Sequence, residues 1–281
     1  MYDEIPTLTL PSGKNIPALG IGTWNMGERQ TNEAEEIASI RKAVELGMTV
    51  VDTAEMYADG RSEDVVGKAI CDLRQDVFLV SKVYPFNASS KGTIEACERS
   101  LSRLGVEQLD LYLLHWRGSH PLEETVAAFE TLKRSGKIID WGVSNFDTED
   151  MEELFAIENG TNCAANQVLY NLSRRGIEFD LLPWCQDKGI PIMAYSPIEQ
   201  GRILGNHDLI KIAKAYQATP AQVALAFLLE RDGVLAIPKS ARPERVEENR
   251  GTTDLEISDD DWAVLDAAFP PPTRKTSLAM L

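Results

Sequence analysis

Four side chains of the types that transfer protons occur in the first half of the chain. Asp52 lies in the apolar run TVVDT, Lys82 in VFLVSKV, and His115 ends LDLYLLH, while Tyr57 follows Asp52 by five residues. An unpaired charge is costly to bury, so we expect Asp52 and Lys82 to form an ion pair between neighbouring strands, which lie about 4.8 Å apart. Together the four residues are typical of a site that donates a proton to a developing alkoxide.

Tyr57 is the candidate donor. A free phenol has a pKa of about 10, and a nearby ammonium favours the phenolate, so we expect Lys82 to lower the pKa of Tyr57. Asp52 would keep Lys82 charged and oriented, and His115 would hydrogen-bond a substrate carbonyl or relay a proton. Taken singly, these residues also fit a buried ion pair, a core histidine and a rim aromatic, but their joint placement favours the functional interpretation.

The elements that position these residues alternate along the chain. After an N-terminal hairpin over residues 7–19, with Pro-Ser-Gly-Lys as its turn, eight apolar runs predict strands buried on both faces. Helical patterns follow them, with Ser62 and Asp147 as expected N-caps. Glycines at 47, 105 and 136 are the expected helix ends. The runs are ALGIG, TVVDT, VFLVSKV, LDLYLLH, IDWGVS, AANQV, PIMAYS and VLAIPKS, and the helices are expected at 33–46, 62–73, 91–104, 122–135 and 147–157.

Eight such units predict an α/β protein, a single-domain (β/α)₈ TIM barrel over residues 1–281 with an N-terminal hairpin and a short C-terminal tail. A doubly wound dinucleotide-binding sheet is the alternative, but its G-x-G-x-x-G motif would need glycine where Asn25 stands. Barrel enzymes place their chemistry where the strands end. Every predicted strand ends in a polar group there: Thr23-Trp24, Asp52, Lys82, His115, Ser144-Asn145, Gln167, Tyr195 and Lys239-Ser240.

Composition narrows the function classes further. Asp and Glu number 44 against 28 Lys and Arg, a net charge of −16, which disfavours nucleic acid and anionic membrane surfaces as partners. No apolar run is long enough to span a membrane, and the first residues lack the pattern of a signal peptide. The four cysteines are far apart and fit buried free thiols, so we expect no metal site. These features predict a cytoplasmic enzyme or binding protein.

The sequence resembles the aldo-keto reductases from Leu8 to about Phe269, most closely the prokaryotic methylglyoxal-reductase and diketo-gluconate-reductase branch. The motifs that carry the resemblance are LGIGTW (19–24), GMTVVDTAEMY (47–57), VFLVSKV (77–83), LDLYLLHW (109–116), GKIIDWGVSNF (136–146), NQVLYN (166–171), AYSP (194–197) and IPKSARPERVEEN (237–249). The resemblance implies a monomeric barrel that reduces aldehydes and ketones with NADPH, small α-oxo-aldehydes among them.

It also implies roles for individual residues. Tyr57 would be the general acid, Lys82 and Asp52 its tuning pair, and His115 the residue that orients the carbonyl. Trp24 and Trp116 would form the wall of an apolar substrate pocket. The residues implied at the cofactor are Thr23; Ser144, Asn145 and Gln167 for the nicotinamide amide; Tyr195 for the nicotinamide ring; Lys239, Ser240 and Arg245 for the 2′-phosphate; and Glu248 and Asn249 for adenine.

The chain departs from the family pattern at two places. After AYSP it reads Ile198-Glu199-Gln200-Gly201, where relatives often have Leu-Gly. A carboxylate near a pyrophosphate would be unfavourable unless it points away, so Glu199 is not among the expected cofactor contacts. The segment after Phe269 is short, so we expect a more open pocket. A non-catalytic barrel that binds NADPH as a regulatory subunit is the alternative function, and a metal-dependent hydrolase is disfavoured because only Asp52 and His115 could serve as ligands.

Overall fold

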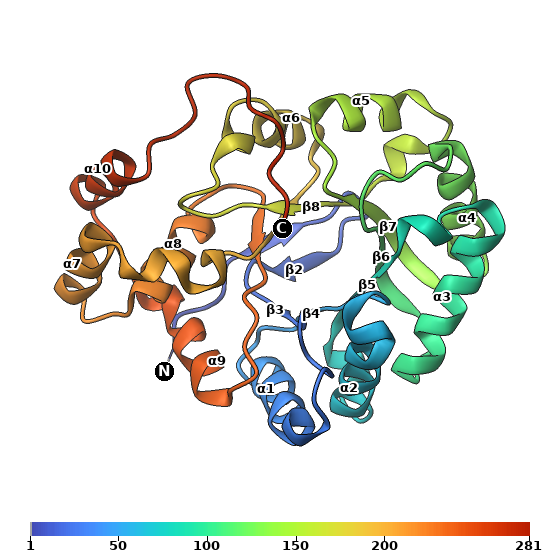
Figure 1. Cartoon of the computed structure of the whole chain (residues 1–281), viewed down its shortest axis with the longest axis horizontal. Coiled ribbons are helices and arrows are strands. Elements are labelled where there is room, and N and C mark those ends of the chain that lie inside the picture. The colour runs from blue at the N-terminus through green and yellow to red at the C-terminus, as the bar shows by residue number, and fades with distance from the viewer. Residues whose placement is uncertain (1) are drawn as a thin grey trace.

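A computed structural model describes residues 2–281. Eight parallel strands form one sheet in chain order. Parallel bridges from Leu19 to Ala236 and from Gly22 to Lys239 join its last strand to its first, so the sheet closes into the predicted barrel (Figure 1). The strands are β3 (Ile21–Gly22), β4 (Val50–Asp52), β5 (Phe78–Val83), β6 (Leu109–Leu114), β7 (Ile138–Ser144), β8 (Asn166–Leu169), β9 (Ile192–Tyr195) and β10 (Val234–Ala236).

Helices surround the barrel, as Figure 1 shows. All five helices predicted by range are present, with ends that differ by a few residues. The helices are α1 (Glu33–Glu45), α2 (Arg61–Ile70), α3 (Ser90–Leu104), α4 (Leu122–Arg134), α5 (Thr148–Ala156), α6 (Leu181–Lys188), α7 (His207–Ala215), α8 (Pro220–Leu229), α9 (Pro243–Arg250) and α10 (Asp259–Ala268).

The N-terminal hairpin is confirmed and covers one end of the barrel. Its strands β1 (Thr7–Thr9) and β2 (Asn15–Pro17) pair antiparallel. Buried hairpin side chains such as Leu10 pack in one cluster with inward-facing strand residues such as Leu111. Lys14 reaches Asp110 at the start of β6, with 2.6 Å between Nζ and Oδ1. This end is therefore filled and tied down, which leaves the opposite end for ligands.

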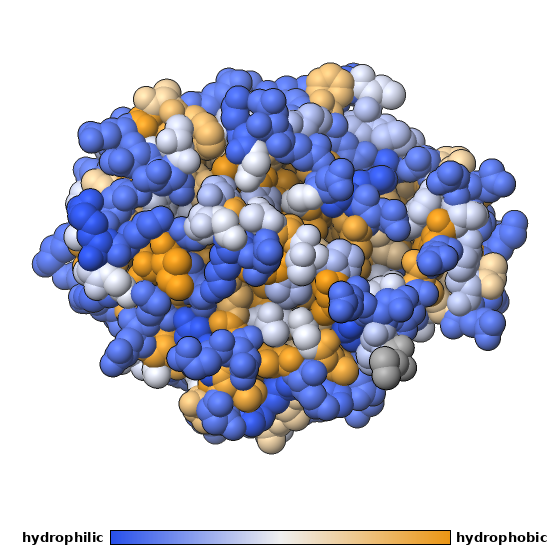
Figure 2. Space-filling model, turned by 180° about the vertical axis from the view of Figure 1, so that it is seen from behind, coloured by the Kyte–Doolittle hydropathy of each residue, from blue (hydrophilic) through white to orange (hydrophobic). Residues whose placement is uncertain are grey.

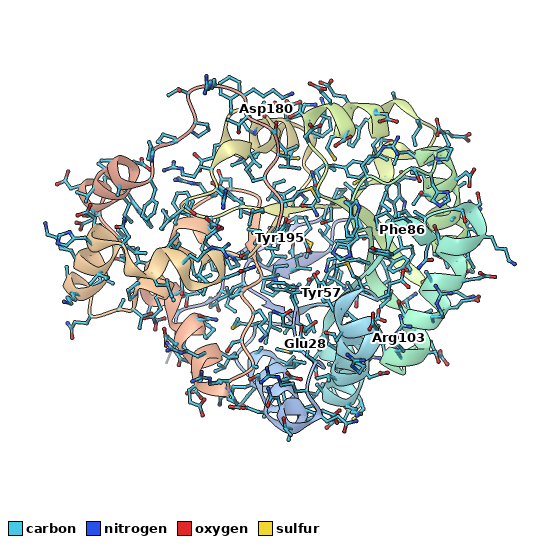
Figure 3. The ribbon with its side chains drawn as sticks, viewed as in Figure 1. Glu28, Tyr57, Phe86, Arg103, Asp180 and Tyr195 are labelled. Carbon is cyan, nitrogen blue, oxygen red and sulfur yellow. The ribbon has the colours of Figure 1, made fainter. Side chains whose placement is uncertain are left out.

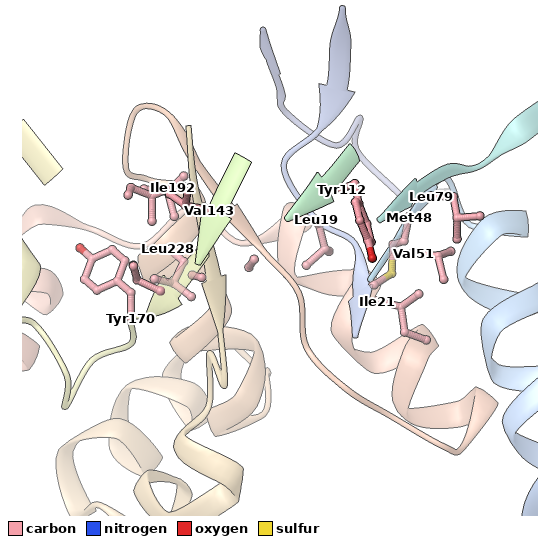
Figure 4. Packing of buried hydrophobic residues seen from close by; sticks show 14 of the residues in the cluster. Leu19, Ile21, Met48, Val51, Leu79, Tyr112, Val143, Tyr170, Ile192 and Leu228 are labelled. Carbon is pink, nitrogen blue, oxygen red and sulfur yellow. The ribbon is translucent and has the colours of Figure 1, made fainter. Parts of the chain in front are cut away.

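A second, larger apolar cluster fills the layer between strands and helices. Figure 4 shows part of it, with Ile21, Val51 and Leu79 on neighbouring strands packing near Met48 and Tyr112. All five side chains are almost completely buried. Burial of these strands on both faces explains why their sequences are apolar without alternation.

The helix caps confirm one predicted N-cap and correct the other. The Asp147 side chain accepts a hydrogen bond from the Asp150 amide, and the Asp150 side chain accepts one from the Asp147 amide, so α5 begins with a capping box. Ser62 is not an N-cap, because α2 begins one residue earlier, after Gly60. Its hydroxyl is instead buried and donates to Thr23 Oγ1 at 2.8 Å. The glycine at 105 ends α3 with φ of 64°, as predicted.

The segment after α10 crosses the face of the barrel where the strands end. In Figure 1 it runs from α10 past α6, and the C-terminus lies over the barrel centre. The opposite face, in Figure 2, is mainly hydrophilic at its periphery, with hydrophobic patches between. Within residues 2–281, no helix has the length and apolar character needed to cross a membrane.

Candidate active site

A cavity of about 640 Å³ opens at the end of the barrel where the strands end. In the view of Figure 3, Tyr57 and Tyr195 lie near the centre of the molecule, and both line this cavity. Ten of the residues proposed from the sequence line it: Trp24, Asp52, Tyr57, His115, Trp116, Ser144, Asn145, Gln167, Tyr195 and Lys239. Residues from seven strands or the loops after them thus meet in one cavity, as the barrel topology predicts.

Lys82 lies beneath the cavity and is completely buried. Its Nζ donates to Asp52 Oδ2 at 2.7 Å, to the Thr53 carbonyl at 2.8 Å and to Tyr57 Oη at 3.2 Å. The ammonium therefore uses all three of its protons, one of them on the tyrosine hydroxyl. The predicted ion pair between Lys82 and Asp52 is therefore present, and its lysine also contacts the hydroxyl of Tyr57.

The pKa of Tyr57 shifts in the opposite direction from the one expected. Burial of the phenol, together with the nearby Asp52 carboxylate, raises the pKa of Tyr57 well above its ordinary value. Burial also lowers the pKa of Lys82, and the ion pair with Asp52 opposes that shift. The expectation of an acidified phenol is therefore wrong for this state of the protein, because Asp52 partly offsets the ammonium and water is excluded. Tyr57 keeps its proton at neutral pH and is available as a donor.

His115 stands beside Tyr57, with ring centroids 5.7 Å apart in an edge-to-face arrangement. Burial, and then the charge of Lys82, hold the pKa of His115 well below its ordinary value. A neutral imidazole carries one N–H, so it can still donate one hydrogen bond. Trp116 packs against His115, with their ring centroids 5.0 Å apart, and forms the next part of the cavity wall.

A chain of hydrogen bonds links the residues predicted for the nicotinamide to the ion pair. Gln167 Nε2 donates to Asp52 Oδ1 at 2.7 Å, which turns its amide oxygen away from that carboxylate. Ser144 Oγ donates to the Gln167 carbonyl at 2.8 Å. Tyr195 Oη donates to Asn145 Oδ1 at 2.9 Å, and the other end of that amide donates to the His115 carbonyl at 3.1 Å. The residues predicted for the cofactor and those predicted for proton transfer thus share one hydrogen-bond network.

Five other predicted cofactor residues do not line this cavity. Thr23 is completely buried, and its hydroxyl donates to the Asp52 carbonyl at 3.0 Å, so it supports β4 from behind. Four others extend from the Lys239 side of the cavity along α9 or its approach: Ser240, Arg245, Glu248 and Asn249. Arg245 is exposed and pairs with Glu248 at 2.5 Å. An exposed cation at this position is free to exchange partners with a phosphate.

Several lining residues were not predicted. Met56, Met280 and Leu281 add apolar surface at the mouth, and Ile198 and Gln200 follow β9. The run Met56-Tyr57 could have identified Met56, since it directly precedes a candidate catalytic residue. Nothing in the local sequence indicates that the last two residues reach the cavity. The sequence predicted a more open pocket because the segment after Phe269 is short. Met280 and Leu281, at the end of that segment, nevertheless line the pocket, which the prediction did not anticipate.

Other candidate sites are few in the part of the chain that the structure describes. Residues 2–281 contain no group of three or more His, Cys, Asp or Glu side chains arranged to hold a metal ion. A second cavity of about 260 Å³ lies under the C-terminal segment, between Lys275–Ala279 and the loop after β8. Its three cations are already paired: Arg174 with Glu199, Arg175 with Glu178 and Asp266, and Lys275 with Glu149.

Comparisons with known proteins agree with this geometry. The family model described as "Aldo/keto reductase family" matches residues 18–269. Methylglyoxal reductase YeaE of Escherichia coli is 52% identical over 272 residues, which cover 95% of this chain and 96% of the relative. Glyoxal reductase of Bacillus subtilis is 36% identical over 264 residues, covering 93% and 92% of the two chains. A crystal structure of an aldo-keto reductase from Klebsiella pneumoniae in complex with NADPH superimposes with a TM-score of 0.97 at 50% identity, covering 99% of this chain and 100% of that one.

Proposed function

Because the chain belongs to the aldo/keto reductase family and is an NADP-dependent oxidoreductase, we propose that it reduces small aldehydes and ketones, α-oxo-aldehydes such as methylglyoxal among them, with Tyr57 as the general acid. The observation that carries this proposal is the position of Tyr57. Its hydroxyl lines the cavity and accepts a hydrogen bond from Lys82, which Asp52 holds in turn. A positioned proton donor suits carbonyl reduction, in which a developing alkoxide takes up a proton, and the ammonium beside it can stabilise the phenolate that remains.

NADPH, when bound, supplies a hydride to the carbonyl carbon. The carbonyl oxygen then gains negative charge, and Tyr57 Oη donates its proton there to give the alcohol. Lys82 stabilises the phenolate that this leaves, because its Nζ lies 3.2 Å from that oxygen. His115 donates a hydrogen bond to the same carbonyl oxygen and orients it. Because the pKa of Tyr57 is raised in the free protein, the hydroxyl keeps its proton until the carbonyl oxygen becomes basic enough to accept it.

The residues present fit NADPH at several points. Tyr195 offers an aromatic ring beside the cavity, and Gln167, with its donor end held by Asp52, can present an acceptor oxygen to an amide. Lys239 at the cavity and Arg245 beyond it supply cations in a protein of net charge −16. A local cationic cluster is what an adenosine 2′-phosphate needs, and this favours NADPH over NADH.

The substrate side of the cavity is mainly apolar. Trp24, Met56 and Trp116 form its wall, and few polar side chains besides Tyr57 and His115 face it there. Such a pocket selects for the reactive carbonyl through two hydrogen bonds and accepts varied small substituents. The name of the 52% identical relative supports methylglyoxal as one substrate.

A steady-state screen with purified protein tests this function. We expect NADPH oxidation with methylglyoxal and other small aldehydes, and a higher kcat/KM for NADPH than for NADH. Stopped-flow mixing of the NADPH complex with the same aldehydes should show oxidation of bound cofactor. If NADPH binds and no carbonyl compound oxidises it, the protein is a regulatory barrel and the proposal is wrong.

A further inference from the structure

The segment that follows β9 forms one wall of the cavity, and three of its non-glycine residues have left-handed backbone conformations. Ser196, Glu199 and Gln200 have φ values of 49°, 51° and 54°. Residues with a side chain rarely adopt this left-handed conformation, which persists only where other contacts hold it. The residues of this segment that line the cavity are Ser196, Pro197, Ile198, Gln200 and Gly201.

Glu199 is the member of this segment that faces away from the cavity. It is 3% exposed, and it accepts hydrogen bonds from two arginines. Arg174 donates to Oε1 through Nε at 3.1 Å and Nη2 at 2.9 Å, and Arg202 donates to the same oxygen at 2.9 Å. Burial opposes ionisation, but the hydrogen bonds from Arg174, Arg202 and Asn171 bring the pKa of Glu199 below its ordinary value. The carboxylate is therefore charged and fully partnered at neutral pH.

Asn171 connects this ion cluster to the start of the segment. Its Nδ2 lies 2.9 Å from Glu199 Oε2 and 2.9 Å from the Ser196 carbonyl. Its Oδ1 accepts from the Ser173 amide at 2.9 Å, which fixes the direction of the side chain. One side-chain amide thus hydrogen-bonds to two of the three left-handed residues, Ser196 and Glu199. Ser196 Oγ is itself buried without a hydrogen-bond partner beside the cavity.

We propose that Glu199 is a positioning residue whose ion pairs with Arg174 and Arg202 hold residues 196–201 against the cavity and slow the dissociation of NADPH. The inference rests on the proposed function, because it takes the ligand of this wall to be the cofactor. Segment 196–201 directly follows Tyr195, the aromatic proposed for the nicotinamide. Glu199 contacts none of Tyr57, Lys82 and His115, so the chemical step should not depend on it.

The test is the dissociation rate of NADPH, measured by displacement in a stopped-flow fluorimeter. Glu199→Gln and Glu199→Ala should release NADPH about tenfold faster than the unchanged protein, or more, since one carboxylate anchors both arginines. Single-turnover oxidation of saturating NADPH by methylglyoxal should change by less than about twofold. Arg174→Lys keeps the charge but loses the two-pronged contact, so it should shift the dissociation rate in the same direction by less.

Asp72→Asn is the matched control, because Asp72 forms a two-pronged ion pair with Arg41 on the helical surface, at 2.5 and 2.9 Å. It should leave NADPH release unchanged. An unchanged NADPH dissociation rate in folded Glu199→Gln, Glu199→Ala and Arg174→Lys would overturn the inference. Lower melting temperatures with an unchanged dissociation rate would mean that the ion pairs only stabilise the fold. If the unchanged protein fails to bind NADPH, the proposed function fails first.

Discussion

Tyr57 depends on two neighbours with opposite effects. The Lys82 ammonium lies 3.2 Å from its oxygen and favours the phenolate, whereas burial and the Asp52 carboxylate favour the phenol. The second influence prevails, and the pKa of Tyr57 is raised. Ammonium stabilisation therefore matters most once the proton has left, when the oxygen carries a charge that Lys82 can neutralise.

His115 gives a pH prediction at the same scale. Its pKa is well below the ordinary value of 6.5, so the ring stays neutral throughout the range where a free histidine titrates. We expect kcat/KM for a neutral aldehyde at saturating NADPH to stay flat as the pH falls from about 7.5 to about 5.5. A loss of activity with an apparent pKa near 6.5 that disappears in His115→Gln would show that the ring is ordinary and charged at low pH.

Residue types identified most of the candidate site, and physical reasons separate the successes from the errors. Asp52 and Lys82 could be paired from sequence because neither can be buried alone. The direction in which the pKa of Tyr57 shifts could not be predicted from sequence, because it depends on how deeply the phenol is buried and on how close the Asp52 charge lies. Thr23 precedes Trp24 at a strand end, yet its hydroxyl turns to the Asp52 carbonyl, a direction that spacing alone does not indicate.

Elements place these residues through the ends of strands and the starts of helices. The apolar runs predicted all eight strands, because burial on both faces leaves a continuous signal. Ser62 was a less reliable signal for a helix N-terminus, because its buried hydroxyl donates a hydrogen bond to Thr23 and does not cap the helix. The segment 196–201 was not predictable, because its left-handed positions are occupied by Ser196, Glu199 and Gln200 and are held by side chains distant in sequence.

The capping box of α5 gives a prediction for an element. Asp147→Ala removes the acceptor for the Asp150 amide, which lies 2.9 Å away, and should lower the free energy of unfolding by about 1 kcal/mol. Urea unfolding followed by circular dichroism measures this as a lower midpoint with an unchanged slope. Asp147→Asn keeps an acceptor oxygen and should lose clearly less. Equal losses in the two variants would mean that the charge at the helix start, and not the cap, stabilises α5.

At the scale of the whole molecule, we propose that residues 1–281 form one domain, although Met1 lies outside the described residues. The N-terminal segment is joined to the helix that follows the last strand of the barrel and to the turn after that helix: Arg250 Nη2, in α9, donates to the Asp3 carbonyl at 2.7 Å, and the Asp3 amide donates to Asp254 at 2.8 Å. Parallel bridges close the barrel between its first and last strands. Neither half of the barrel can bury its strands without the other.

One cooperative unfolding transition should follow from this closure. The five tryptophans are spread along the chain, at positions 24, 116, 141, 184 and 262, so their fluorescence reports on all parts of the barrel. We expect fluorescence and far-ultraviolet circular dichroism to give the same urea midpoint. Two separated midpoints would indicate parts that unfold independently. Saturating NADPH should raise that midpoint, because it binds only the folded state.

The most direct measurement of the central claim is a single turnover of Tyr57→Phe. The variant keeps the ring and the cavity but has no proton to give to the carbonyl oxygen. Oxidation of bound NADPH by methylglyoxal should slow by about 10²- to 10⁴-fold while the affinity for NADPH changes little. Tyr216→Phe removes a hydroxyl that donates to Asp261 at 2.8 Å, and neither residue lines the cavity, so this variant should react at the unchanged rate. A Tyr57→Phe rate within a few-fold of the unchanged protein would contradict the mechanism.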